Sequence, residues 1–233
     1  MQVIARIRNA FPTKFGLPRQ SGLVPELTST IVFEPEFRVP EALRGIESYS
    51  HLWLIWEFHQ AIRDSEKKGD DVPWKPTVRP PRLGGNTRMG VFATRSPFRP
   101  NPLGLTVVKL VAVEDSPEGV VLIVSGADMM DGTPIYDIKP YLPYVDSVPE
   151  AVGGFTQSTA EYHVDVDVPA ELLARIPKEH HQTLLGVLRQ DPRPAYQHDE
   201  SRVYGLPFAG MDVKFTMKGG ILTVVDVVKE GHT

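Results

Sequence analysis

The residues best suited to chemistry gather in two stretches of the sequence. The first runs from Thr77 to Leu105 and combines arginines and polar side chains with prolines at positions 80, 81, 97, 100 and 102. Proline fixes backbone φ, whereas Gly84 and Gly85 permit a close approach. A rigid backbone with many hydrogen-bond donors is typical of a site preorganised for a polar ligand. The alternative is that the prolines only shape connections between strands.

The second stretch, from Ser125 to Asp146, carries acid–base groups. Asp137, Lys139 and Tyr141 alternate along the chain, so they share one face if a strand extends that far. A carboxylate, an amine and a phenol are all candidates for general acid–base catalysis. A salt-bridged network fits the same three side chains equally well, and the sequence leaves both interpretations open.

Common catalytic and cofactor signatures are missing. The sequence has no Walker motif, no GxSxG, no HExxH and no dinucleotide-binding glycine pattern. Cysteine is absent, which excludes disulfides, thiolate metal sites and cysteine nucleophiles. His51 and His59 are spaced to share a strand face, but no third ligand clusters with them, so we expect no metal site.

Charge is distributed unevenly along the chain. The net charge is −4, but residues 72–113 hold seven Lys and Arg side chains and no acidic one, so the remainder carries −11. A long basic stretch without acids indicates an anionic partner, and arginine is well suited to bidentate phosphate contacts. The alternative is a basic patch that pairs only with the acidic remainder.

The elements that position these stretches are mainly strands. The chain of 233 residues, with 19 Gly and 22 Pro, has short alternating or β-branched runs separated by turns. Such spacing predicts a closed or nearly closed β-barrel. We expect strands over residues 3–8, 29–33, 49–58, 89–93, 105–113, 120–124 and 133–138.

The C-terminal third has a different pattern. Residues 149–160 are small and polar and predict a linker between a barrel domain (1–148) and a small α+β domain (161–233). In the latter we expect a strand over 162–168, a helical region over 169–190 interrupted at Pro177, and a hairpin turning at Gly219 and Gly220. No apolar run spans a bilayer and the N-terminus does not read as a signal peptide, so we expect a cytoplasmic protein.

Several motifs together resemble one family. The sequences Ser96-Pro-Phe-Arg-Pro-Asn-Pro-Leu-Gly and Asp131-Gly-Thr-Pro-Ile-Tyr-Asp-Ile-Lys-Pro-Tyr, with the segment 11–20, residues 51–59 and Asp191-Pro-Arg-Pro-Ala-Tyr, are similar to the TrmO (TsaA-like) family. The resemblance implies a homodimeric β-barrel methyltransferase, not of the Rossmann type, that uses S-adenosylmethionine. Family members methylate N6 of N6-threonylcarbamoyladenosine at position 37 of threonine tRNA.

The resemblance also assigns the cofactor site. The implied cofactor contacts are Pro18, Arg19, Gln20, His59, Gln60, Arg88, Phe98 and the backbone of Asp128, Met129, Met130 and Asp131. Arg19 or Arg88 would hold the cofactor's carboxylate. The Phe98 ring is suited to contact a sulfonium.

Further roles follow for substrate and tRNA. Asp137 is our candidate for accepting the N6 proton, with Lys139 as its neighbouring acid–base group, and Tyr141 or Tyr196 would stack on or hydrogen-bond to the base. The phosphate candidates are Arg79, Arg82 and Arg95, and Arg99 would serve either ligand.

Two other classes of function remain as alternatives. One is an RNA-binding barrel without catalysis, which would not bind S-adenosylmethionine. The other is a methyltransferase of a small molecule, which would show no salt-sensitive association with tRNA.

Overall fold

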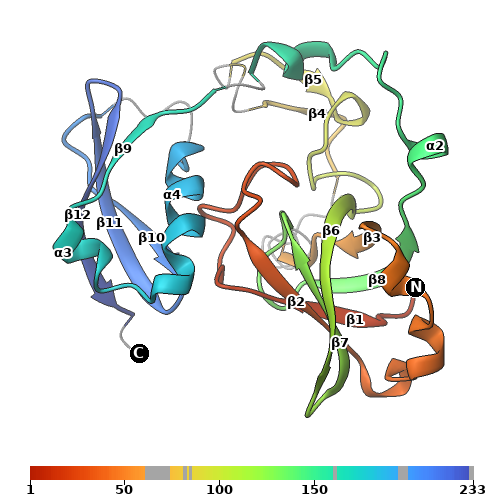
Figure 1. Ribbon diagram of the computed structural model, residues 1–233. Helices are drawn as coiled ribbons and strands as arrows, with labels where there is room; N and C mark the ends of the chain where they lie inside the picture. The colour runs from red at the N-terminus through yellow and green to blue at the C-terminus, as the bar shows by residue number, and fades with distance from the viewer. Residues whose placement is uncertain (61–73, 81–82, 84–85, 160–161, 194–198, 231–233) are drawn as a thin grey trace.

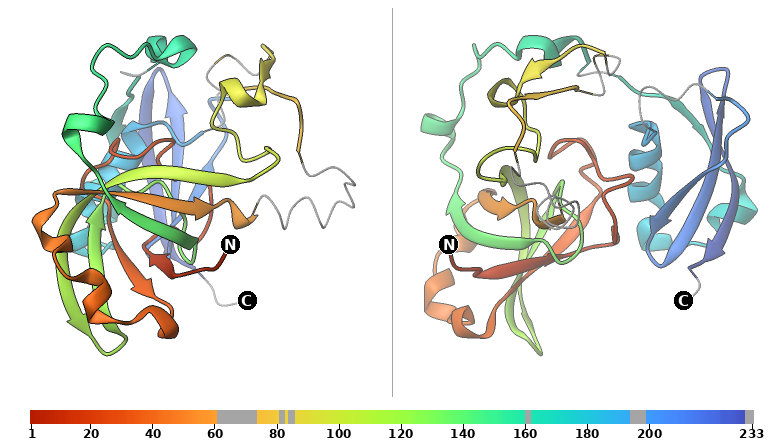
Figure 2. Two further views of the ribbon diagram at one scale, coloured as in Figure 1. Left: turned by 90° about the vertical axis from the view of Figure 1, so that its right-hand side faces the viewer. Right: turned by 180° about the vertical axis from the view of Figure 1, so that it is seen from behind.

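The computed structural model describes residues 1–233 except 61–73, 81–82, 84–85, 160–161, 194–198 and 231–233. The chain is mainly β, as the sequence predicts, and its strands form two larger sheets and one short hairpin (Figures 1 and 2). No helix in the described part of the chain is long and apolar enough to cross a membrane.

Six strands form a closed barrel in the order β1-β2-β7-β6-β3-β8. All neighbours pair antiparallel, and Ala5 of β1 pairs with Ile135 of β8 to close the ring. The strands are β1 (Ala5–Arg8), β2 (Thr28–Phe33), β3 (His51–Glu57), β6 (Leu103–Ser116), β7 (Gly119–Ser125) and β8 (Pro134–Pro140). Three short 3₁₀ turns, Pro35–Phe37, Pro40–Leu43 and Ile46–Ser48, connect β2 to β3.

Strand β3 shows why the barrel has two faces. Its burial alternates strictly: Leu52, Leu54 and Trp56 are buried, whereas the residues between them are half-buried. Because side chains alternate across a strand, the first set points into the barrel and the second points outward. The interior is filled by aliphatic side chains from all six strands, which excludes water from the barrel axis.

A second sheet, in the order β10-β11-β12-β9, stands beside the barrel with α4 on the side that faces it (Figures 1 and 2). Its strands are β9 (Asp165–Asp167), β10 (Tyr204–Phe208), β11 (Met211–Lys218) and β12 (Ile221–Lys229). Helices α3 (Ala170–Leu173) and α4 (His181–Arg189) flank it, and α2 (Pro143–Asp146) follows the barrel. Gly219 and Gly220 both have positive φ in the β11–β12 turn, as predicted.

The N-terminal segment joins the core of this second sheet. Phe11, Val24 and Leu27 are fully buried in the same apolar cluster as α4 and strands β10 to β12. The rings of Phe11 and Phe208 lie 5.1 Å apart, and Thr183 of α4 donates a hydrogen bond to the carbonyl of Glu26. The barrel and the C-terminal sheet are therefore packed through the segment between β1 and β2.

Three predicted elements differ from the structure. Residues 89–93 form only the two-residue strand β5 (Met89–Gly90), paired with β4 (Thr77–Val78), before the 3₁₀ turn Val91–Ala93. The strand expected over 162–168 shortens to β9, which has a partner at only three positions of β12. Finally, β3 ends at Glu57, so the argument that placed His51 and His59 on one strand face is wrong.

Candidate functional site

Two loops meet at the end of the barrel where β7 finishes. The loop after β7, residues 126–133, lies against the segment between β1 and β2. Gly22 N–H donates to the Gly126 carbonyl at 2.9 Å, and the Asn9 side-chain amide donates to the Met129 carbonyl at 2.8 Å. The structure thus brings the predicted Pro18–Gln20 and Asp128–Asp131 groups onto adjoining loops. Within the loop after β7, the Met130 carbonyl accepts hydrogen bonds from the N–H and the hydroxyl of Thr133.

A chain of hydrogen bonds runs from the barrel interior to Asp128. The Trp56 indole N–H donates to Thr106 Oγ1 at 2.9 Å, and that hydroxyl donates to Asp128 Oδ1 at 2.8 Å. Trp56 and Thr106 are both buried. Burial raises the pKa of Asp128, and the hydrogen bond from Thr106 acts against that rise. A carboxyl group with a raised pKa is therefore fixed at the junction of the two loops.

Cationic and amide groups surround the same carboxylate. The positive charge of Arg95 and the backbone N–H of Ser21 both act to lower the pKa of Asp128, although the net direction is upward. Arg95 also donates to the side-chain oxygen of Gln20, which links the cationic stretch to the Pro18–Gln20 segment. Gln20 donates in turn to the Arg19 carbonyl. Asp128, Gln20 and Arg95 thus form one polar cluster.

Arg19 makes its contacts with the C-terminal part of the chain. Its Nη2 donates to the carbonyls of Asp191 and Arg193 at 3.3 and 3.1 Å. Asp191 and Arg193 are themselves a buried ion pair at 2.8 Å, with side chains 10% and 14% exposed, and Tyr162 donates to the same carboxylate. Burial alone would raise the pKa of Asp191, but Arg193 outweighs it and the pKa is lowered. The predicted contact of Arg19 with a cofactor carboxylate must therefore compete with these carbonyls.

The cationic stretch folds around the β4–β5 hairpin. Arg88 is exposed and donates to the Thr77 hydroxyl at 3.0 Å. The Arg99 side chain hydrogen-bonds to its own loop, because its Nη1 donates to the carbonyls of Thr94 and Ser96. The Phe98 ring is 41% exposed. Two further phosphate candidates, Arg79 and Arg95, have exposed side chains, whereas Arg82 lies outside the described residues.

The second predicted group, Asp137, Lys139 and Tyr141, lies on the outer face of the barrel. Asp137 and Lys139 form an ion pair at 2.9 Å, so the salt-bridge interpretation holds for these two. Strand β8 ends at Pro140, and Tyr141 packs against Trp53 and His51 with ring centroids 5.8 and 6.3 Å away. The Asp128 hydrogen-bond chain begins on the inner face instead. Tyr196 lies outside the described residues.

The region after β3 holds two more predicted cofactor residues. His59 and Gln60 are half-buried and directly precede the first stretch that lies outside the described residues. Pro18 is buried and Arg19 and Gln20 are half-buried, so that segment presents a polar edge. Among the described residues no three His, Asp or Glu side chains cluster as a metal site would require.

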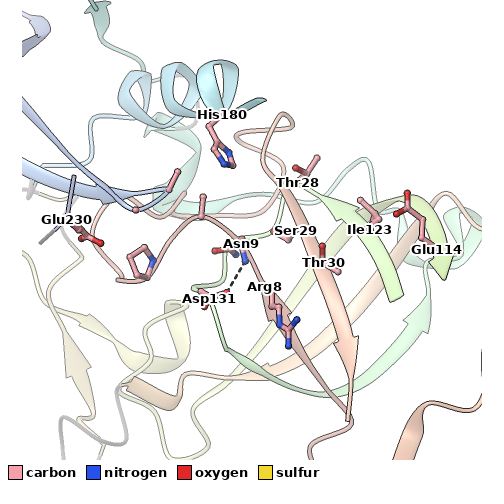
Figure 3. Close-up of a pocket in the computed structure, with 14 residues that line it drawn as sticks. Arg8, Asn9, Thr28, Ser29, Thr30, Glu114, Ile123, Asp131, His180 and Glu230 are labelled. Atoms are coloured by element: carbon pink, nitrogen blue, oxygen red, sulfur yellow. Dashed lines mark hydrogen bonds between the residues drawn. The ribbon is translucent and has the colours of Figure 1, made fainter. Parts of the chain in front are cut away.

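A cavity of about 840 Å³ opens beside the loop after β7 (Figure 3). Its lining comes from β1, β2 and β7 and from the C-terminal part, including Asp131, Asn9 and His180. The Asp131 carboxylate accepts the Asn9 backbone N–H at 3.0 Å (Figure 3). The Asp131 side chain therefore lines this cavity, whereas Asp128 of the same loop does not.

Comparison with known families matches nearly the whole chain. Residues 6–147 match the model of the tRNA-methyltransferase O N-terminal domain, and residues 161–230 match that of the TrmO C-terminal domain. The chain belongs to the TrmO family. The resemblance drawn from the sequence motifs is thereby confirmed.

Relatives and solved structures of the TrmO family cover most of this chain. The tRNA (adenine(37)-N6)-methyltransferase of Escherichia coli K12 is 43% identical over 84% of this chain and 83% of its own. A Pseudomonas aeruginosa relative named "Putative S-adenosylmethionine-dependent methyltransferase RcsF" is 41% identical over 96% and 95%. A crystal structure of TrmO from Pseudomonas aeruginosa superposes with a TM-score of 0.74 at 33% identity, covering 98% of each chain.

Sequence reasoning did not single out three polar residues of this candidate site. Thr106 had one signal, a hydroxyl within the apolar run 103–108, but threonine is common in strands. Asp191 and Arg193 were visible only as part of a family motif. Their carbonyl contacts with Arg19 join positions more than 170 residues apart. No local pattern reveals such a contact.

Proposed function

We propose that this chain is a homodimeric, S-adenosylmethionine-dependent methyltransferase of tRNA that acts in the cytoplasm. Its proposed substrate is N6 of the N6-threonylcarbamoyladenosine at position 37 of threonine tRNA. The observation that carries the proposal is the match of both TrmO domain models along one chain, together with relatives named tRNA (adenine(37)-N6)-methyltransferase. The unbroken acid-free run of residues 72–113 supports a polyanionic substrate.

The residues present fit the cofactor. S-adenosylmethionine combines a carboxylate, an ammonium group and a sulfonium, and the cationic stretch offers counterparts for the carboxylate and the sulfonium. Arg88 donates to the neutral hydroxyl of Thr77, so it suits the carboxylate better than Arg19, which donates to two backbone carbonyls. The exposed Phe98 ring suits the sulfonium. The remaining contacts would come from Pro18, Gln20, His59, Gln60 and the backbone of residues 128–131.

When bound, S-adenosylmethionine supplies an electrophilic methyl group for an in-line displacement. As the new N6–C bond forms and the bond from sulfur to methyl breaks, the N6 proton has to leave. The protein must therefore hold the base still and accept that proton.

Two carboxylates are candidates for the proton acceptor. Asp137 is ion-paired with Lys139 on the outer face of the barrel. Asp128 lies at the loop junction, and burial raises its pKa, which makes its ionised form the stronger base. Tyr141 and Tyr196 remain our predictions for contacts with the base.

The deciding experiment is nucleoside mass spectrometry of bulk tRNA with and without the gene. The proposal expects the methylated threonylcarbamoyladenosine to disappear on deletion. The purified protein should methylate threonine tRNA that carries the threonylcarbamoyl group but not the same tRNA without it. Binding of S-adenosylmethionine with no transfer to any tRNA would favour a small-molecule methyltransferase, and RNA binding without S-adenosylmethionine binding would favour a non-catalytic barrel.

Matched variants assign the proton acceptor. Asp137→Asn and Asp128→Asn are compared for single-turnover methyl transfer, with S-adenosylmethionine affinity measured in parallel. The acceptor's variant should lose transfer while retaining cofactor affinity. If both variants transfer at the wild-type rate, neither carboxylate takes the proton. Tyr196→Ala tests base contact in the same assay, and sedimentation equilibrium tests the proposed homodimer.

A further inference from the structure

Two aromatic side chains stack on the surface of the β4–β5 hairpin. The rings of Trp74 and Phe92 have centroids 6.5 Å apart and planes inclined by only 21°. Phe92 is 74% exposed, an unusual position for a large apolar ring. The cofactor and catalytic assignments above use neither residue.

The backbone fixes this aromatic pair in place. Thr77 pairs with Gly90, and Val91 N–H donates to the Pro76 carbonyl at 3.0 Å. Val91 is buried, so the 3₁₀ turn that begins there directs the next side chain, Phe92, outward. Lys75 N–H donates to the Phe98 carbonyl at 3.2 Å, which ties the neighbouring loop to the same hairpin. The backbone around the β4–β5 hairpin (Figure 1) therefore positions the pair.

Positive charge flanks the pair on both strands of the hairpin. Lys75 follows Trp74 in the sequence, and Arg88 precedes β5, where it contacts Thr77 of the opposite strand. Lys75, Arg79 and Arg88 are all exposed. No acidic residue occurs between positions 72 and 113 to neutralise them. An exposed aromatic surface bordered by cations complements a chain that alternates flat bases with phosphates.

We infer that the Trp74–Phe92 pair is a stacking platform for an unpaired base of the tRNA anticodon loop. The flanking Lys75 and Arg79 contact the adjoining phosphates. Single-stranded loops expose base faces that paired stems hide, and aromatic side chains stack on them without reading their hydrogen-bond edges. This platform rests on the proposed tRNA substrate. It contacts an unpaired base of the anticodon loop other than the adenosine that is methylated.

The test uses the full-length protein and a fluorescent anticodon stem-loop oligonucleotide. Phe92→Ala should weaken binding by about ten-fold or more, since base–aromatic stacking carries that much affinity. Phe92→Tyr keeps the ring and should bind like the wild type. Tyr144→Ala removes another highly exposed ring, 85% exposed in α2, and should have no effect. S-adenosylmethionine affinity should be unchanged in all three variants.

The salt dependence of binding separates stacking from charge. Loss of a phosphate contact in Arg79→Gln should make the slope of log association constant against log salt concentration less negative by about 0.7–0.9, because fewer counterions are released. Phe92→Ala should weaken binding with the slope unchanged. An unchanged affinity in Phe92→Ala overturns the platform. A changed sedimentation profile in that variant also overturns it, because the ring would then be covered by a second copy of the chain.

The outcomes also separate the platform from the proposed function. If the wild type methylates threonine tRNA and Phe92→Ala does so with an unchanged KM for tRNA, only the platform is wrong. If the wild type transfers no methyl group but Phe92→Ala still loses stem-loop affinity, the platform stands and the proposed reaction is wrong.

Discussion

Replacing Thr106 with valine tests the hydrogen-bond chain at the centre of the site. Valine has nearly the shape of threonine, so the packing of the barrel interior is retained while the hydroxyl is lost. That hydroxyl serves two groups at once, as acceptor for the buried Trp56 indole and as donor to the half-buried Asp128. The substitution therefore leaves the buried indole donor without its partner and takes one hydrogen bond from the Asp128 carboxyl.

The expected cost follows from those two groups. A buried donor that loses its partner costs about 1–3 kcal/mol, and a hydrogen bond to a charged group contributes about 1.5–3 kcal/mol, so Thr106→Val should lower the free energy of unfolding by about 2–6 kcal/mol. The cost should depend on pH. The Thr106 hydrogen bond lowers the pKa of Asp128 against the effect of burial, so removing it penalises the ionised carboxylate in particular. The loss should be smaller near pH 4 than near pH 8, because the ionised fraction of Asp128 grows as the pH rises.

Urea unfolding at both pH values, followed by tryptophan fluorescence, measures the effect. Thr106→Ser keeps the hydroxyl and should recover most of the lost stability, apart from the methyl group. S-adenosylmethionine affinity should fall in the valine variant and return in the serine variant. A valine variant as stable as the wild type at both pH values would refute the reasoning, because the two hydrogen bonds would then contribute nothing.

Three further predictions concern stability and its dependence on pH. Asp191→Ala removes one partner of a buried ion pair and should cost about 3–5 kcal/mol in calorimetry, whereas Asp226→Ala breaks an exposed pair and should cost less than about 1 kcal/mol; equal losses would contradict the assigned burial. Asp128→Asn should raise thermal stability near pH 8 and not near pH 4, since the raised folded pKa makes ionisation unfavourable as pH rises above the ordinary value of about 3.9. Gly104→Ala places a Cβ 2.1 Å from the Trp56 ring and should cost about 1–3 kcal/mol; an unchanged melting temperature would show that the ring moves aside freely.

The sequence predicted the fold best where local alternation coincides with burial on one face. Strand β3 and the long strand β6 follow that rule, and their boundaries fall within a few residues of those expected. The sequence-based prediction failed where the pairing partner decides whether a strand forms. The Met89–Ala93 run has strand-forming residues, but its partner β4 is only two residues long, and the chain turns at Val91.

The candidate site was predictable only as a set of motifs. The resemblance placed residues 18–20 and 128–131 together, and the structure sets their loops side by side. It did not show that Arg19 donates to carbonyls of the C-terminal part, because that contact depends on how two distant segments pack. Nor did it show that Asp137 and Lys139 are paired on the outer face, since the sequence fitted catalysis and ion pairing equally well.

The burial of Phe11, Val24 and Leu27 among the C-terminal strands affects the order in which the chain can fold during synthesis. On the ribosome, the segment that bears Pro18 to Gln20 emerges early, whereas its apolar partners in α4 and strands β10 to β12 are synthesised last. The barrel strands are therefore complete while Phe11, Val24 and Leu27 still lack the C-terminal part of their core. A fragment that stops at the barrel would retain every strand of the ring and expose these three side chains beside the segment that carries Pro18 to Gln20.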